Sequence, residues 1–176
     1  MLKRLIKDRR GVSAIEFALI APVMIMLYLG LAEMTMGLMA KRRVSHVASA
    51  VGDLIAQNPS TTTADLDDTF TVGEAVMEPF PVGVLTIRLT SVRADASGAP
   101  KVVWSRVHGA SLPVLAPNTT VTLPAGLVAA GESVIMADTR YAYTSPVTQT
   151  LPQGIVFANT YYLRPRRSDQ VACTDC

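Results

Sequence analysis

The feature that most constrains this chain is an uncharged apolar run near its N-terminus. Sixteen residues from Phe17 to Ala32 carry no charge, and the apolar character continues past Glu33 to Ala40. A helix rises ~1.5 Å per residue and a bilayer core is ~30 Å thick, so about 20 residues span it. A buried core helix is the weaker alternative, because a small domain rarely surrounds a helix that is apolar on all sides. We therefore expect a transmembrane helix.

This helix is predicted to continue beyond the membrane. A removable secretory signal would need a shorter apolar core and a polar start to the mature chain, whereas this run continues into an amphipathic pattern. Asn58-Pro59 ends the pattern, because the residue before a proline is pushed out of the helical region. We expect one element over residues 12–57, first apolar and then an amphipathic spine. After Lys41, Arg42 and Arg43, the apolar positions with helical spacing are Val44, Val47, Val51, Leu54 and Ile55.

The charge distribution indicates orientation and excludes one class of partner. The first ten residues hold five basic side chains against Asp8, which leaves 11 basic and 13 acidic residues in the rest of the chain. A domain without a basic excess is not expected to bind nucleic acid. Basic residues flank both ends of the apolar run, and the larger group before it favours a cytoplasmic N-terminus. Everything after about residue 41 would then lie outside the cytoplasm.

The junction between the basic N-terminal segment and the apolar run reads KDRRGVSAIEFALIAP and places Glu16 where hydrocarbon is expected. A carboxylate costs ~2.5 kcal/mol or more toward the centre of a bilayer unless it is paired. Cleavage after Gly11 would give Val12 a free α-ammonium one helical turn before Glu16, and a glycine lets a protease approach the backbone. Alternatively, Glu16 reaches the nearby headgroups. The residues alone leave both interpretations open.

The string RRGVSAIEFALIAPVMI resembles the class III prepilin signature of the Tad (Flp) pilus system, and most closely that of its TadE-like minor pilins, or pseudopilins. The family's pattern is a basic leader ending in glycine, then a glutamate and an aromatic residue at the fifth and sixth positions after the cut. Gly11, Val12, Glu16 and Phe17 match it here. The resemblance covers about 25 residues, including Pro22.

The resemblance implies that residues 1–11 are a leader removed by a prepilin peptidase. It further implies a single-pass protein of the bacterial inner membrane, with a cytoplasmic N-terminus and a periplasmic head, which enters or primes an extracellular pilus. The other expected partners are pilins and minor pilins of the Tad system and inner-membrane lipid. Major Flp pilins are little more than the helix, so the additional ~120 residues favour the TadE-like branch. A late Arg164-Pro165-Arg166 motif also resembles these chains.

Residues 58–176 are predicted to form a small α+β head of pilin-like fold. Thr61 to Thr63 offer capping hydroxyls before a short helix whose apolar face holds Leu66, Phe70, Gly73 and Met77 and which Pro79 and Pro81 end. Four antiparallel strands should pack on this helix and on the spine. They are expected at residues 84–92 and 101–107, which form a hairpin, at residues 134–143, and near residues 159–166, with a looser stretch from His108 to Gly131.

No catalytic, metal or cofactor site is expected. Ser105 and His108 lack the surroundings of a hydrolase triad, and no glycine-rich phosphate loop is present in the sequence. Cys173 and Cys176 could form a local disulfide outside the cytoplasm, stay free, or pair with another chain. Glu33 is expected near the outer interface without a special role, and Lys41 to Arg43 as a membrane-interface anchor.

These observations predict a non-enzymatic minor pilin or pseudopilin that acts in pilus assembly or adhesion. No small-molecule substrate is expected. Gly11 and Val12 would be the processing site, and Glu16 and Phe17 would act in assembly. The alternative is an uncleaved single-span membrane protein whose extracytoplasmic domain binds a partner. An enzyme anchored by one helix would need a catalytic group in the head, and the sequence shows none.

Overall fold

The computed structural model describes residues 11–145 and 154–176 and has the predicted α+β architecture. The chain begins with one long helix, continues through a shorter helix, and then forms an antiparallel sheet in the order β3-β2-β4-β5. The leader was predicted at residues 1–11, and of these residues 1–10 lie outside the described part. The elements are α2 (Val12–Ala56), β1 (Ser60–Thr61), α3 (Thr63–Met77), the 3-10 turn η2 (Val82–Val84), β2 (Leu85–Ala94), β3 (Pro100–His108), β4 (Ser133–Tyr143), β5 (Ile155–Leu163) and β6 (Ala172–Cys173).

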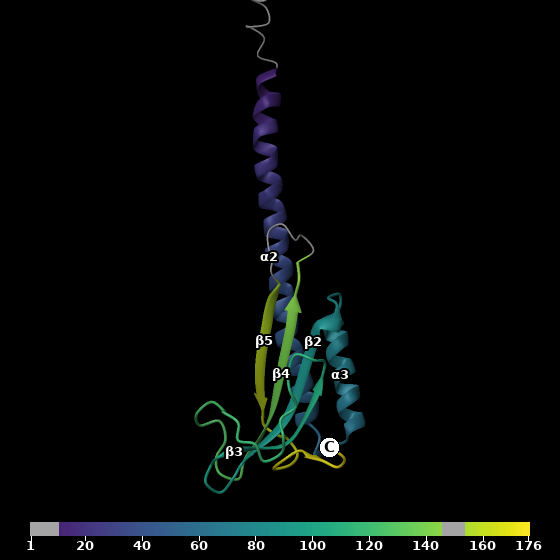
Figure 1. Ribbon diagram of the computed structural model, residues 1–176, viewed down its shortest axis with the longest axis vertical. Helices are drawn as coiled ribbons and strands as arrows, with labels where there is room; N and C mark the ends of the chain where they lie inside the picture. The colour runs from purple at the N-terminus through teal and green to yellow at the C-terminus, as the bar shows by residue number, and fades with distance from the viewer. Residues whose placement is uncertain (1–10, 146–153) are drawn as a thin grey trace, which may run out of the picture.

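Helix α2 has two halves with different surroundings. Its first half extends beyond the sheet as a bare rod, and its second half lies against the head (Figure 1). The buried residues of the second half follow the predicted spacing and include Val44, Val47, Val51 and Ile55. The helix ends at Ala56, two residues before Asn58-Pro59, as the proline rule predicts.

Helix α3 begins with a capping box, in which Thr62 and Asp65 exchange side-chain and backbone hydrogen bonds. Its buried face contains the four predicted residues Leu66, Phe70, Gly73 and Met77. A Cβ on Gly73 would lie 3.0 Å from a methyl of Val51 and 2.7 Å from a methyl of Ile87. A glycine is therefore what lets α3 approach α2 and β2 closely.

The sheet is covered on both faces. Helices α2 and α3 pack on one face, where Leu85, Ile87 and Leu89 of β2 and Ile135 of β4 point into the core. The loop between β3 and β4, which was predicted to be irregular, covers part of the other face. There it packs apolar side chains over Val92, Val134 and Met136, and these loop residues are Leu115, Val121, Leu123, Leu127 and Val128.

Strand β5 is longer than predicted at its start. It begins at Ile155 rather than near Asn159 and ends at Leu163, before the basic motif. The additional residues are ordered by β4, whose last residue, Tyr143, pairs with Ile155. The strand boundary thus depends on the partner strand, which local sequence does not show.

Candidate functional site

The predicted processing and assembly residues lie together at the free end of α2. Gly11 caps the helix and is exposed, and a Cβ there would meet nothing within 4 Å. Val12 is the first helical residue, and Glu16 lies four residues on, which is about one turn. Phe17 is 72% exposed. No head residue covers this end of the helix in the part of the chain that the structure describes, so it is open to a protease, lipid or another helix.

The N-terminal end of α2 has no side-chain cap for its free backbone N–H groups. The helix dipole makes such an end partly positive, so an α-ammonium created at Val12 would be repelled by it. Glu16 is the carboxylate nearest along the helix to offset both positive charges. The geometry therefore fits a charge pair between the ammonium of Val12 and Glu16, in the same chain or in a neighbour.

Helix α2 is also the one described helix long and apolar enough to cross a membrane. Its most apolar 18-residue window is not buried at all within the chain. This surface is compatible with membrane anchoring, because helices in soluble cores bury such residues.

Glu33 is the residue that sequence reasoning missed. It was expected near the outer interface without a special role, and its burial was not predicted: it is 2% exposed, and its Oε1 atom has no hydrogen-bond partner among the described residues. A signal was present in the sequence. The buried positions Val47, Val44 and Ala40 have helical spacing that continues back through Gly37 to Glu33.

The basic residues after the apolar run do not act alike. Lys41 and Arg42 are exposed. Arg43 instead donates a 2.8 Å hydrogen bond to the Val76 carbonyl in the last turn of α3. This bond satisfies a free carbonyl at a helix C-terminus and ties the two helices together, so Arg43 has a structural contact besides the interface position that the sequence predicts.

The Arg164-Pro165-Arg166 motif fastens the C-terminal segment to the spine. The backbone N–H of Arg166 donates to the Ala56 carbonyl at the end of α2, and its side chain pairs with Asp53. Arg164 pairs with Glu132 before β4. Arg166 of the motif thus satisfies one of the carbonyls left free at the end of the helix.

The C-terminal residues close against α3. Cys173 and Cys176 form a disulfide, and β6 pairs in parallel with β1. Asp175 accepts hydrogen bonds from the hydroxyl and backbone N–H of Thr63, which hold the pKa of that carboxyl below its ordinary value. Asp175 and the two cysteine sulfurs lie close enough together to suggest a metal site. The sulfurs are bonded to each other and the carboxylate accepts hydrogen bonds from Thr63, so these three groups are not free to bind a metal ion.

The groups that could suggest an enzyme are separated. The Ser105 hydroxyl is bonded to Thr90, and His108 is paired with Glu74 at 2.8 Å and stacked on Phe70. Ser105 and His108 are therefore hydrogen-bonded to other residues and not to each other.

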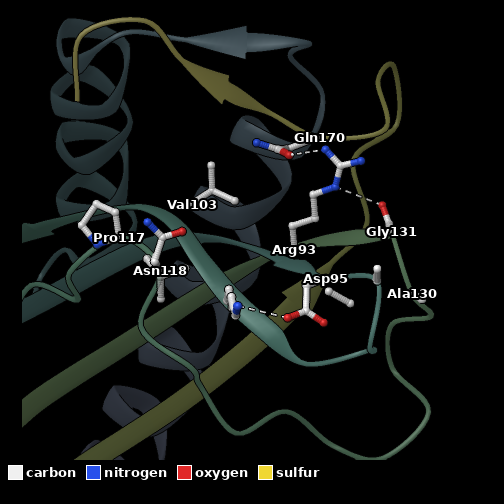
Figure 2. Close-up of a pocket in the computed structure, with 12 residues that line it drawn as sticks. Arg93, Asp95, Val103, Pro117, Asn118, Ala130, Gly131 and Gln170 are labelled. Carbon is white, nitrogen blue, oxygen red and sulfur yellow. Dashed lines mark hydrogen bonds and ion pairs between the residues drawn. The ribbon is translucent and has the colours of Figure 1, made fainter.

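A hollow of about 630 Å³ lies around the β2–β3 turn (Figure 2). Its charged groups are satisfied within the chain: Arg93 donates to the Gly131 carbonyl and to Gln170, and Asp95 pairs with Lys101 at 3.1 Å. Hydrogen bonds from the Ser97 side chain, Lys101 and Ala99 keep the pKa of Asp95 far below its ordinary value. The charged groups that line the hollow are therefore already paired and are not free to bind a ligand.

Comparison with known proteins gives a family match that includes the free end of α2. Residues 11–53 match the family model described as TadE-like protein, which confirms the resemblance seen in the sequence. The match begins at Gly11 and ends within the amphipathic half of α2. No curated protein and no solved structure is significantly similar to the chain. The TadE-like segment indicates a protein related to the Tad pilus system.

Proposed function

We propose that this chain, TadE-like over residues 11–53, is a non-enzymatic minor pilin or pseudopilin of a Tad-type pilus. A prepilin peptidase would process it after Gly11, and it would then act in pilus assembly or adhesion. The observation that carries this proposal is the bare first half of α2, which starts with an exposed Gly11–Val12 junction and places Glu16 one turn later.

Cleavage is a hydrolysis that changes the charge at the end of the helix. Water adds across the Gly11–Val12 peptide bond, the leader leaves with a carboxylate on Gly11, and Val12 keeps an α-ammonium. Glu16 then has a counter-ion about one helical turn away. Pairing offsets the cost of holding a carboxylate in hydrocarbon.

Packing between bare helices would supply the rest of the assembly energy. Lipid is as apolar as the helix surface, so close contact and polar pairs, rather than the hydrophobic effect, hold membrane helices together. Phe17 offers a large exposed ring next to Glu16, and Gly30 leaves open space for a neighbouring backbone. The head, which is fastened to α2, would follow the helix into its place in the assembly.

The partners in this proposal are a prepilin peptidase, other Tad pilins and inner-membrane lipid. The proposed topology has a cytoplasmic leader and a periplasmic head. A small-molecule substrate and a cofactor have no place in this function.

Intact-mass measurement tests the processing step. The chain is purified from membranes of cells with and without a prepilin peptidase. We expect the mature chain to begin at Val12 in the first case and the full leader to remain in the second. A chain that begins at Met1 in both would support instead an uncleaved single-span protein with a partner-binding head.

Substitution of Glu16 tests the assembly step separately. Glu16→Gln removes the charge while keeping the shape of the side chain, so cleavage should proceed and piliation should fall. Ser13→Ala, three residues earlier on the same exposed end, is the matched control and should leave both unchanged. Normal piliation by Glu16→Gln would contradict the role given to this carboxylate.

A further inference from the structure

The group that the proposed function leaves unexplained is the buried acid Glu33. It is 2% exposed and lies 17 residues beyond Glu16, about 25 Å along the axis and still within the apolar part of α2. Its Oε1 atom has no partner in residues 11–145 and 154–176. A buried acceptor without a donor is costly, and within the part of the chain that the structure describes this acceptor has none.

A second unsatisfied group lies beside the same cleft. The Tyr143 hydroxyl, at the end of β4, is buried and also lacks a hydrogen-bond partner among the described residues. The Tyr143 ring is held in place by Phe80 and Phe157, with ring centroids 6.3 and 5.9 Å away. The cleft has a volume of about 480 Å³, and its lining also includes Gly30, Met34, Gly37 and Ile155.

This lining defines the chemistry of the ligand. Apart from Glu33, the Tyr143 hydroxyl and Lys41 at one end, the cleft walls are apolar or glycine. The missing component is therefore a hydrogen-bond donor carried on an apolar body, and a cationic donor would also complement the charge of a carboxylate. Gly30 and Gly37 flank Glu33 on the same side of α2, so a helix could come close to the carboxylate.

We propose that this cleft receives the mature N-terminus of a second copy of the chain, with the α-ammonium of Val12 donating to Glu33 and to the Tyr143 oxygen. This inference rests on the proposed cleavage after Gly11. The described helix has no lysine or arginine between Val12 and Ala40, so the α-ammonium is the one cation at the end of an apolar segment. Lys41 lines one end of the cleft, yet the Glu33 Oε1 atom has no partner among the described residues, so Lys41 does not satisfy it.

The donor must come from another copy because α2 is continuous. Val12 and Glu33 of one chain are 21 residues apart on an unbroken helix, a separation of about 31 Å. Two copies shifted by that distance along their axes bring the two groups together. Glu16 would then hold the ammonium of the subunit in the membrane, and Glu33 of a neighbour would receive it after this shift.

Disulfide trapping tests the register directly. Two tagged full-length copies are expressed together in cells with the peptidase, one carrying Ser13→Cys and the other Met34→Cys, which are again 21 residues apart. Both native cysteines are joined to each other, so the introduced thiols are the reactive pair. Thr35→Cys is the matched control, because it lies at nearly the same depth but points about 100° further from the cleft.

We expect a membrane-permeant oxidant to link Ser13→Cys to Met34→Cys at least about tenfold more than to Thr35→Cys. Glu33→Gln keeps the side-chain shape and should lower the link about tenfold, since a charged hydrogen bond is lost. Tyr143→Phe keeps the ring and should lower it several-fold. Cells without the peptidase should give no link, because the ammonium is not formed.

Three results would overturn the inference: equal linking to both positions, a link that persists with Glu33→Gln, or one that persists with the leader attached. Absence of the link in a chain shown by intact mass to start at Val12 would also overturn it, as expected if a lipid ammonium occupied the cleft, while leaving the proposed function intact. A leader that stays attached in cells with the peptidase would refute the proposed function and, with it, this inference.

Discussion

The ion pair between Arg88 and Asp138 gives the sharpest test of how the head is held together. The two residues face each other across β2 and β4, and the Asp138 Oδ2 atom accepts hydrogen bonds of 3.0 and 2.8 Å from the Arg88 guanidinium. Its Oδ1 atom accepts a 2.5 Å bond from Thr160 on β5. The side chains are 13% and 11% exposed, so the pair is largely removed from water.

Asp138→Ala removes these three hydrogen bonds and leaves a mostly buried guanidinium without a counter-ion. We expect the free energy of unfolding to fall by about 3 kcal/mol, near the low end for breaking a buried pair because some solvent still reaches both groups. Replacing both partners, with Arg88→Met and Asp138→Leu, should bring the protein back to within about 1 kcal/mol of the wild type, since no charge is stranded.

Chemical denaturation of the full chain in detergent micelles measures these changes. Trp104 is the sole tryptophan, is buried, and donates a 2.9 Å hydrogen bond to the Val171 carbonyl, so its fluorescence reports unfolding of the head. Asp67→Ala, which breaks the exposed pair with Arg106, is the control and should cost no more than about 0.5 kcal/mol. A double variant as unstable as Asp138→Ala would refute the reasoning.

Three further predictions concern α3 and its surroundings. Phe70→Ala empties a site that is 1% exposed and should lower the free energy of unfolding by about 3–5 kcal/mol in the same assay, whereas a loss below 1 kcal/mol would mean that the core closes over the gap. Thr62→Ala removes the capping box and should cost about 1 kcal/mol, and an unchanged denaturation midpoint would contradict this. Hydrogen bonds from Thr63 lower the pKa of Asp175, so this contact stabilises the fold fully above pH 3.8, the ordinary pKa. The stabilisation is lost as the pH falls through the lower pKa of the folded state. A carboxyl ¹³C titration of Asp175 with a midpoint at or above 3.8 would contradict this.

Those parts of the fold that repeat a local pattern could be predicted from the sequence. The apolar run, the three-and-four spacing after Lys41 and the proline after Asn58 gave the extent of α2, because each rule acts within one or two turns. The same applies to the buried face of α3 and to the hairpin of β2 and β3. The start of β5 could not be found in this way, since Ile155 is extended through its pairing with Tyr143.

The residues of the candidate site likewise divide into those that local sequence predicts and those that depend on tertiary contacts. The Gly11, Val12 and Glu16 arrangement is a matter of spacing along one helix, so the sequence contains it completely. For Glu33 the helical spacing of the buried positions places it on the packed face of α2, but whether the head reaches that far along the helix is tertiary information, since the cleft beside it is lined by Tyr143, Ile155 and Phe157. Arg43 is similar: its carbonyl partner, Val76, lies 33 residues away, and a basic residue after an apolar run otherwise indicates a membrane interface.

The unbroken path of α2 from Val12 to Ala56 determines how movement passes through the subunit. The helix has no hinge where it enters the head, and the Thr139 hydroxyl on β4 and the Arg166 backbone N–H bond to its carbonyls at Val44 and Ala56. A displacement of the half of α2 that lies against the head would therefore carry the sheet with it, because both ends of that half are hydrogen-bonded to the head.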